Sequence, residues 1–308
     1  MMDENYKLSA KEREELEHAE NIKVQLKKSD IVSGIIKNLV LAILSIIWLI
    51  PIIWLVANAF SVYKGVNISH FFPEAYTLEN FKVVITESDP DGIVMYRHWF
   101  INTLLIAIFS CIISTIFVLM VSYALSFCRF AGRRAYMNVA MVIGMFPSVL
   151  SMVIIYFVMK QIGLTGSHIG MVIVYSAGSG LGYLIIKGFM DTISMSIKEA
   201  AIIDGASEWK IFTGVILPLC KPIIVYQVIS SFLAPWADFV FAKLMLGKDS
   251  TTWTVAIGLY NMLDKSRLST NFAYFCAGGL LVSIPIGILF VIMQKYYVEG
   301  VTSGASKG

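Results

Sequence analysis

The sequence has few charged residues, few histidines and few cysteines for its length. Only 15% of its 308 residues are charged, whereas 57% are apolar. Ordinary soluble domains are about 25% charged and must cover their surface with polar groups. The apolar surplus is therefore too large for a core and indicates a lipid bilayer as the solvent. The net charge of +3 is small, and the basic residues lie at the edges of apolar segments, which argues against a nucleic-acid partner.

Metal, disulfide and nucleotide sites have no supporting pattern. The cysteines lie in or beside apolar runs without a C-x-x-C spacing, and we expect four inert thiols: Cys111, Cys128, Cys220 and Cys276. The histidines are equally dispersed, which disfavours a membrane enzyme: His18, His70, His98 and His168. Because no G-x-x-x-x-G-K-[ST] phosphate loop is present, the chain does not cradle ATP in that manner. The apolar segments hold few charges, which disfavours an ion-coupled secondary transporter.

Six apolar blocks are long enough to cross a membrane. Each supplies about 20 mostly apolar residues, the length of helix that spans about 30 Å of hydrocarbon. Helices are expected because lipid offers backbone groups no hydrogen-bond partner. The predicted spans are residues 35–60, 99–127, 136–159, 168–190, 219–241 and 272–296. We therefore predict an all-α membrane protein, with kinks at the prolines inside the blocks: Pro51, Pro147, Pro235 and Pro285.

The distribution of lysine and arginine predicts which side of the membrane each loop faces. With the N-terminus inside, the inner segments hold roughly two thirds of the basic residues, which places both termini in the cytoplasm. Residues 1–34 form a charged N-terminal tail, and residues 297–308 form a short C-terminal tail. Ser9 and Glu12 make a capping-box pattern that predicts a helix in the N-terminal tail, with a disordered tail as the alternative.

Between the fourth and fifth spans, on the predicted inner side, lies the segment SMSIKEAAIIDGASEWKIFTGVILPLCKP (residues 194–222). It is too polar to span a membrane and too patterned for a linker. An amphipathic helix over residues 197–204 precedes Gly205, a second short amphipathic helix follows, and Pro218 ends the element. Two short helices that meet at a glycine form a compact projection, which we call the knob (residues 194–218). Such a projection can seat in a groove of a soluble partner.

Three short motifs stand at fixed spacing in the knob: Glu199-Ala200-Ala201, Asp204-Gly205-Ala206 and Ile216-Leu217-Pro218. With Trp209 and Phe212 they resemble the EAA loop of ATP-binding-cassette importer permeases, in the longer form typical of the carbohydrate-uptake branch. Further similar stretches cover nearly the whole chain after residue 38: 51–60, 102–107, 123–134, 161–170, 235–242 and 294–308. The last stretch resembles the ending of the maltose- and oligosaccharide-type subunit. Two positions depart from the family pattern, because Ser194 stands at a frequent proline and Lys198 at a frequent acidic residue.

The resemblance implies the fold of a type I importer permease, with six transmembrane helices and a cytoplasmic EAA coupling loop in a bacterial-type inner membrane. It implies the shorter, six-span subunit of a heterodimeric permease, which is no enzyme and holds no cofactor. ATP and Mg are then bound by a partner ATPase dimer that docks on the knob. The other implied partners are a second, homologous permease subunit, an extracellular solute-binding protein, membrane lipid and a carbohydrate, preferably an oligosaccharide such as maltodextrin.

The resemblance also assigns residues to the ATPase contact. Those in the knob are Glu199, Ala200, Ala201, Asp204, Gly205, Trp209 and Phe212. Those in the C-terminal tail are Gly300, Thr302, Gly304 and Lys307. Each set has an alternative: Trp209, Ile211 and Phe212 would instead pack on helices of their own chain, and the tail would be a frayed terminus.

Two further sets of candidates lie outside the knob. Polar side chains are costly inside a span, and those of the fifth predict a translocation path at Gln227, Ser231, Trp236 and Asp238. The alternative is hydrogen bonding between helices, with an interfacial tryptophan. The outer loop 242–271 is predicted to contact the binding protein through Trp253, Tyr260 and Asp264. Here the alternative is a structural cover of the closed outer gate.

Overall fold

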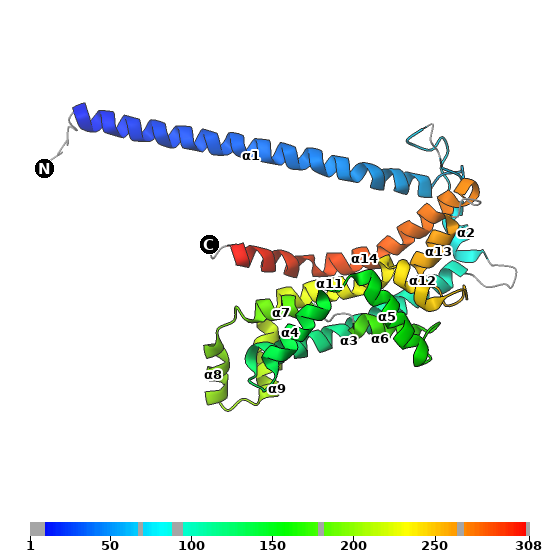
Figure 1. The fold of residues 1–308 in the computed structure, drawn as a ribbon. Coiled ribbons are helices and arrows are strands. Elements are labelled where there is room, and N and C mark those ends of the chain that lie inside the picture. Colours follow the sequence, from blue (N-terminus) through cyan, green and yellow to red (C-terminus); the bar gives the residue numbers. More distant parts are fainter. Residues whose placement is uncertain (1–9, 67–69, 88–94, 178–181, 264–267, 306–308) are drawn as a thin grey trace. The chain divides into compact units, whose positions relative to one another are not determined.

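The computed structural model describes residues 10–66, 70–87, 95–177, 182–263 and 268–305, with side chains described only between residues 33 and 294. In these ranges the chain is helical apart from turns and one isolated bridge, between Ser61 and Tyr76 (Figure 1). Four helical stretches are long and apolar enough to cross a membrane: Ser33–Ala59, Met95–Phe127, His168–Met190 and Ser269–Gln294. Two bent helix pairs raise the number to six if each pair forms one span. This architecture agrees with the predicted all-α membrane fold.

The first helix, α1 (Ala10–Ala59), joins the charged tail and the first span without a break. Residues up to Ala57 form a unit of their own, separate from the compact unit that begins at Asn58. Trp48 is 75% exposed, and most other apolar side chains in the span part of this helix are also exposed, although less fully. Lipid or another chain is the natural cover for such a surface. The predicted capping residue Ser9 directly precedes the helix but lies outside the described residues.

The second span, α3 (Met95–Phe127), is the central helix of the larger unit. It packs most extensively against α6 (His168–Ala177), α7 (Gly182–Met190) and α11 (Lys221–Ala237). Its buried side includes Ala107, Ser110 and Ser114, whose small side chains let neighbouring helices approach closely. Helix α11 also packs against α14 (Leu268–Ala305), the last span. A displacement of α3 therefore acts on most of the bundle.

The third span departs from the single helix predicted over residues 136–159. It consists of α4 (Arg133–Gly144) and α5 (Ser148–Gln161), which meet at an angle of 105°. Pro147 stands directly before α5. Proline has no backbone N–H and fixes its own φ, so it suits the start of a helix better than its interior. The predicted kink is present, but the chain turns far more sharply than a kinked span would.

Three short helices lie at the end of the bundle opposite to the knob, where we predicted loops or the end of a span (Figure 1). They are α2 (Glu79–Thr86), α12 (Val240–Leu246) and α13 (Val255–Met262). The segment between α12 and α13 is fixed by Asn102 of α3, whose amide donates to the carbonyls of Thr251 (2.8 Å) and Trp253 (3.1 Å). Gly258 packs so closely on Trp99 that an added Cβ would lie 1.9 Å from its ring. This end is therefore rigidly packed.

Candidate coupling site

The knob begins with α8 (Met195–Ile203), and each of its ends is capped by the local sequence. The Ser194 hydroxyl accepts a hydrogen bond from the backbone N–H of Ser196 (3.3 Å), which satisfies a donor at the first turn. At the other end Gly205 has a φ of +77°, a conformation that a Cβ disfavours. The N–H of Gly205 bonds to the carbonyl of Ile202 and that of Ala206 to Ala201, the pattern of a Schellman cap. The bend predicted at Gly205 is thus the C-terminal cap of α8.

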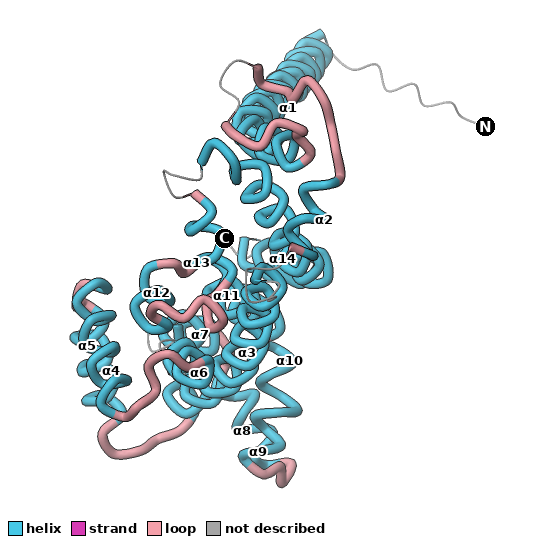
Figure 2. Tube along the Cα trace, turned by 90° about the vertical axis from the view of Figure 1, so that its right-hand side faces the viewer, coloured by secondary structure: helices cyan, strands magenta, loops and turns pink. Residues whose placement is uncertain are grey.

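The second helix, α9 (Glu208–Ile211), is capped by Ser207, which accepts from the N–H of Lys210 (3.4 Å). It continues through a π-helical turn, η2 (Phe212–Ile216), into the short α10 (Leu217–Leu219). The chain then turns by 84° into α11. The element ends one residue after Pro218, close to the predicted boundary. Figure 2 shows α8 and α9 extending beyond the other helices of the bundle.

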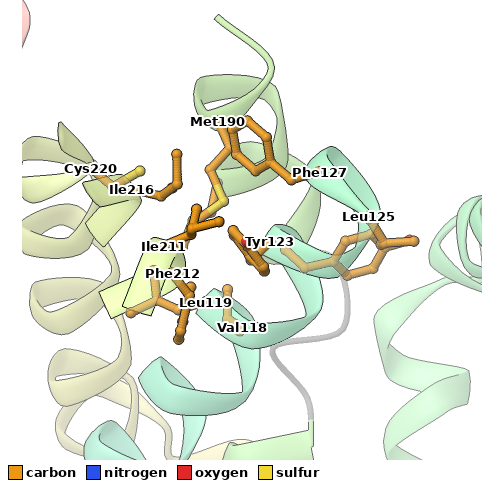
Figure 3. Packing of buried hydrophobic residues seen from close by; sticks show 12 residues of the cluster. Val118, Leu119, Tyr123, Leu125, Phe127, Met190, Ile211, Phe212, Ile216 and Cys220 are labelled. Carbon is orange, nitrogen blue, oxygen red and sulfur yellow. The ribbon is translucent and has the colours of Figure 1, made fainter. Parts of the chain in front are cut away.

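The base of the knob is buried in the core of its own chain. Ile211 and Ile216 are fully buried, and Phe212 is 7% exposed. Figure 3 shows them packed among side chains of α3, where the ring of Phe212 lies 4.9 Å from that of Tyr123. Phe212 was predicted to plug a groove of the ATPase, and this burial instead favours packing on the chain's own helices. Its physical role is to anchor the knob.

The tip of the knob is an exposed apolar surface next to the Gly205 turn. Ile203 is 86% exposed and Trp209 is 65% exposed. The Trp209 ring rests on the anchored Phe212, with ring centroids 5.6 Å apart, so the exposed indole is held in place. Of the remaining predicted coupling residues, Ala201 is half-buried. The others are exposed: Glu199, Ala200, Asp204 and Gly205. All of the predicted coupling residues in the knob except Phe212 and Ala201 are thus exposed to solvent.

An ion pair inside the knob was missed by the sequence analysis. Lys198 of α8 is 4% exposed, and its ammonium lies 2.8 Å from a carboxylate oxygen of Glu208 in α9. The ammonium also donates to the carbonyl of Phe127, the last residue of α3 (3.0 Å). The other oxygen of Glu208 accepts a hydrogen bond from the Tyr123 hydroxyl (2.7 Å). The signal in the sequence was the departure from the family pattern at Lys198.

The same contacts determine the charge of Glu208. The hydrogen bond from Lys198, followed by that from Tyr123, holds the pKa of Glu208 below its ordinary value of 4.5. The carboxylate is therefore ionised at neutral pH. The two knob helices and the end of α3 meet at this one charged contact.

The C-terminal candidates fall at the edge of the described chain. Helix α14 continues to Ala305, so the backbone at Gly300, Thr302 and Gly304 is helical. Nothing is described of their side chains, and Lys307 lies outside the described residues. Their predicted contact with an ATPase stays a prediction.

The predicted path residues of α11 are engaged in packing. Gln227 is buried and donates to the hydroxyl of Ser114 on α3 (3.0 Å). Ser231 donates to the backbone carbonyl of Gln227 (2.6 Å), and Trp236 is buried. Asp238, half-buried just after the helix, accepts from the Tyr175 hydroxyl (2.8 Å) and from the backbone N–H of Phe241 (3.0 Å). The Gln227 and Asp238 contacts favour the alternative of hydrogen bonds between helices, whereas the Ser231 bond lies within α11.

The predicted binding-protein contacts separate into three cases. Trp253 is buried, with its indole N–H donating to the carbonyl of Gly247 (3.2 Å) and the Lys243 ammonium 3.7 Å from its ring centroid. Tyr260 is 60% exposed and stacks on Phe239. Asp264 lies outside the described residues. Only Tyr260 among the described candidates is open to a partner, and Trp253 serves the packing of this end.

In the described ranges, no three His, Cys, Asp or Glu residues lie close enough together to bind a metal ion. All four cysteines are free; Cys111, Cys220 and Cys276 are buried and Cys128 is half-buried.

Comparison with known families decides the identity. Residues 122–303, more than half of the chain, match the family described as binding-protein-dependent transport system inner membrane component. The chain belongs to this family. It is therefore a multi-pass membrane protein and a permease subunit of a binding-protein-dependent importer, with a transport role rather than an enzymatic one.

The permease resembles characterised relatives over most of its length. It is 29% identical to the galactooligosaccharides transport system permease protein GanQ of Bacillus subtilis, over 88% of this chain and 94% of that protein. It is 31% identical to the maltodextrin transport system permease protein MdxG of the same organism, over 88% and 95%. A crystal structure of a bacterial ABC transporter involved in the import of the acidic polysaccharide alginate contains a chain with the same fold. The TM-score is 0.73 at 23% identity, over 87% of this chain and 98% of that chain.

Proposed function

We propose that this permease forms one half of a translocation pathway for an oligosaccharide and is driven by a separate ATPase dimer that docks on the knob. A second, homologous permease subunit supplies the other half, and an extracellular binding protein delivers the sugar. ATP and Mg belong to the ATPase. The relatives named for maltodextrin and galactooligosaccharide transport support the substrate class.

The observation that carries the docking proposal is the contrast between the tip and the base of the knob. Ile203 and Trp209 are exposed at the tip, whereas Ile211 and Ile216 are buried at the base. An exposed apolar tip on a rigid base fits a hydrophobic groove, and aromatic anchors of this kind dominate binding energies. The exposed carboxylate of Glu199 lies on the same helix as Ile203 and is suited to a basic group at the rim of such a groove.

The orientation follows from the same proposal. An ATPase in the cytoplasm requires the knob and both termini on the cytoplasmic side, as the lysine and arginine distribution predicts. The helical stretch with Gly300, Thr302 and Gly304 then lies on the ATPase side as a second contact, and Lys307 is proposed to contribute to the same contact. Tyr260, at the opposite end, faces the binding protein together with Asp264. Ser231 of α11 and Asp238, the residue after this helix, are only partly buried and are the candidates nearest the proposed sugar path.

The test uses the complete complex, purified through a tag on the ATPase. Ile203→Asp places a charge in the proposed apolar contact, and we expect at least a tenfold loss of co-purified permease. The matched control is Leu78→Asp, because Leu78 is 71% exposed, lies at the opposite end and directly precedes helix α2. Retention of Ile203→Asp at the level of this control would overturn the docking proposal. The substrate class is tested in reconstituted vesicles with maltodextrins and galactooligosaccharides. If neither sugar stimulates the ATPase, the proposed oligosaccharide substrate is overturned.

A further inference from the structure

Lys198 is a lysine in a position where lysine is costly. Its side chain is 5% exposed, and an ammonium removed from water requires compensation by an anion and by hydrogen bonds. It has both, in Glu208 on α9 and in the carbonyl of Phe127 at the end of α3. Its ammonium also lies 5.6 Å from the centroid of the Tyr123 ring. Helix α8 thus makes its polar contact with α3 through the buried ammonium of Lys198.

Glu208 completes the connection from the other knob helix. One carboxylate oxygen binds Lys198 of α8, and the other accepts from Tyr123 of α3. The carboxylate side chain is 59% exposed, so the pair is buried on one side only. The contact therefore joins three elements, α8, α9 and α3, through charged and hydrogen-bonded groups. In the apolar core, Phe212 of η2 packs on Tyr123 of α3, and the half-buried Ala201 of α8 packs at the edge of the same cluster.

We infer that Lys198 and Glu208 form a latch that makes the knob and α3 move as one body, so that the ATPase displaces α3 when it displaces the knob. Both are positioning residues. The inference rests on the proposed function, because it assumes that the knob is the part that the ATPase moves. Without the latch, α8 carries the docking surface around Ile203 but turns about the Gly205 hinge instead of transmitting its displacement. The central place of α3, against α6, α7 and α11, makes it the helix through which such movement reaches the pathway.

The principal variant is Lys198→Met, which keeps the length of the side chain and removes its charge. Glu208→Gln tests the other partner, and Lys198→Arg tests whether a cation at this place restores function. Lys210→Met is the control, because Lys210 lies on α9 two residues from Glu208 but is exposed. Each variant is measured in the complete complex in proteoliposomes, for co-purified ATPase, maximal ATPase rate and sugar molecules imported per ATP hydrolysed.

We expect Lys198→Met to bind the ATPase within twofold of wild type and to lower sugar import per ATP at least fivefold. Glu208→Gln should lower it in the same direction, Lys198→Arg should restore most of it, and Lys210→Met should leave it unchanged. A purely structural role would reduce the amount of folded complex without changing import per ATP, and that result would overturn the inference. Loss of ATPase binding by Lys198→Met, with Ile203→Asp also defective, would assign Lys198 to docking and overturn the latch. Normal binding by Ile203→Asp would instead count against the proposed function.

A distance measurement tests the latch without transport. Spin labels at Ile203→Cys and Arg129→Cys, in a chain whose native cysteines are replaced, report the knob tip and the exposed turn after α3. With the latch intact we expect one narrow distance distribution. Lys198→Met should broaden it at least twofold, and an unchanged width would overturn the inference even if that variant lowered transport.

Discussion

The turn at Gly205 allows a graded test of the knob, because the backbone conformation and the surrounding atoms contribute separately to the free-energy cost of a substitution there. A residue with a Cβ costs about 1–2 kcal/mol at positive φ. No atom lies within 4 Å of the position where a Cβ would stand, so no steric clash adds to this cost. Gly205→Ala should therefore destabilise the turn by about 1–2 kcal/mol, which is a factor of about 5–30 in the population of the docking geometry. Gly205→Asn should cost less, because asparagine visits this conformation more readily.

Gly205→Pro should be the most damaging of the series. Proline fixes φ near −65°, whereas the turn requires +77°, and it removes the hydrogen bond from this N–H to the carbonyl of Ile202 (2.9 Å). The assay is sugar-stimulated ATPase activity of the reconstituted complex, with the melting temperature of the permease as the control. We expect activity to fall in the order Gly, Asn, Ala, Pro while the melting temperature stays within a few degrees, since the turn is exposed. Wild-type activity of Gly205→Pro, or a fall that follows the melting temperature alone, would refute the reasoning.

Three further expectations concern the base, the tip and the charge of the knob. Phe212→Ala should lower the free energy of unfolding by about 3–5 kcal/mol, because it leaves a cavity against α3. Trp209→Ala should change the free energy of unfolding by less than about 0.5 kcal/mol yet weaken ATPase binding, because the Trp209 ring is exposed. Equal melting temperatures for Phe212→Ala and Trp209→Ala would contradict the placement of Phe212 in the base and of Trp209 at the tip. Because the pKa of Glu208 is lowered, its contribution to stability is complete above its unfolded value of 4.5 and disappears as the pH falls through the lower folded value. The melting difference between wild type and Glu208→Gln should thus be constant from pH 8 to pH 6 and shrink only below 4.5, and a change between pH 8 and pH 6 would contradict this assignment.

The fold could be predicted from the sequence because its signal is local. Twenty consecutive apolar residues identify a span regardless of its neighbours, and both the family match and the helical structure confirm the fold class. The 105° turn before α5 was not predictable from Pro147 alone. A proline interrupts a helix, but the angle depends on which surfaces the two halves pack against, and that information is distributed over the whole bundle.

The site was less predictable, because an amphipathic pattern identifies an apolar face without its partner. Trp209 and Phe212 both lie on such a face, yet one is exposed and the other is buried against α3. The sequence separates Glu208 from Tyr123 by 85 positions, so their hydrogen bond had no local signal. Trp253 differs from its prediction in the same way as Phe212: an aromatic in a loop is typical of binding surfaces, but this one is buried beneath Lys243.

The most direct test of the account is the location of the knob tip in the assembled complex. Ile203→Cys, in a chain without its native cysteines, is exposed to a membrane-impermeant maleimide in intact cells and in inverted membrane vesicles. The account predicts labelling only in inverted vesicles stripped of the ATPase, and at least tenfold protection when the ATPase is added back. Labelling from the outside of intact cells, or labelling that the ATPase does not reduce, would contradict the claim that this surface is the docking site.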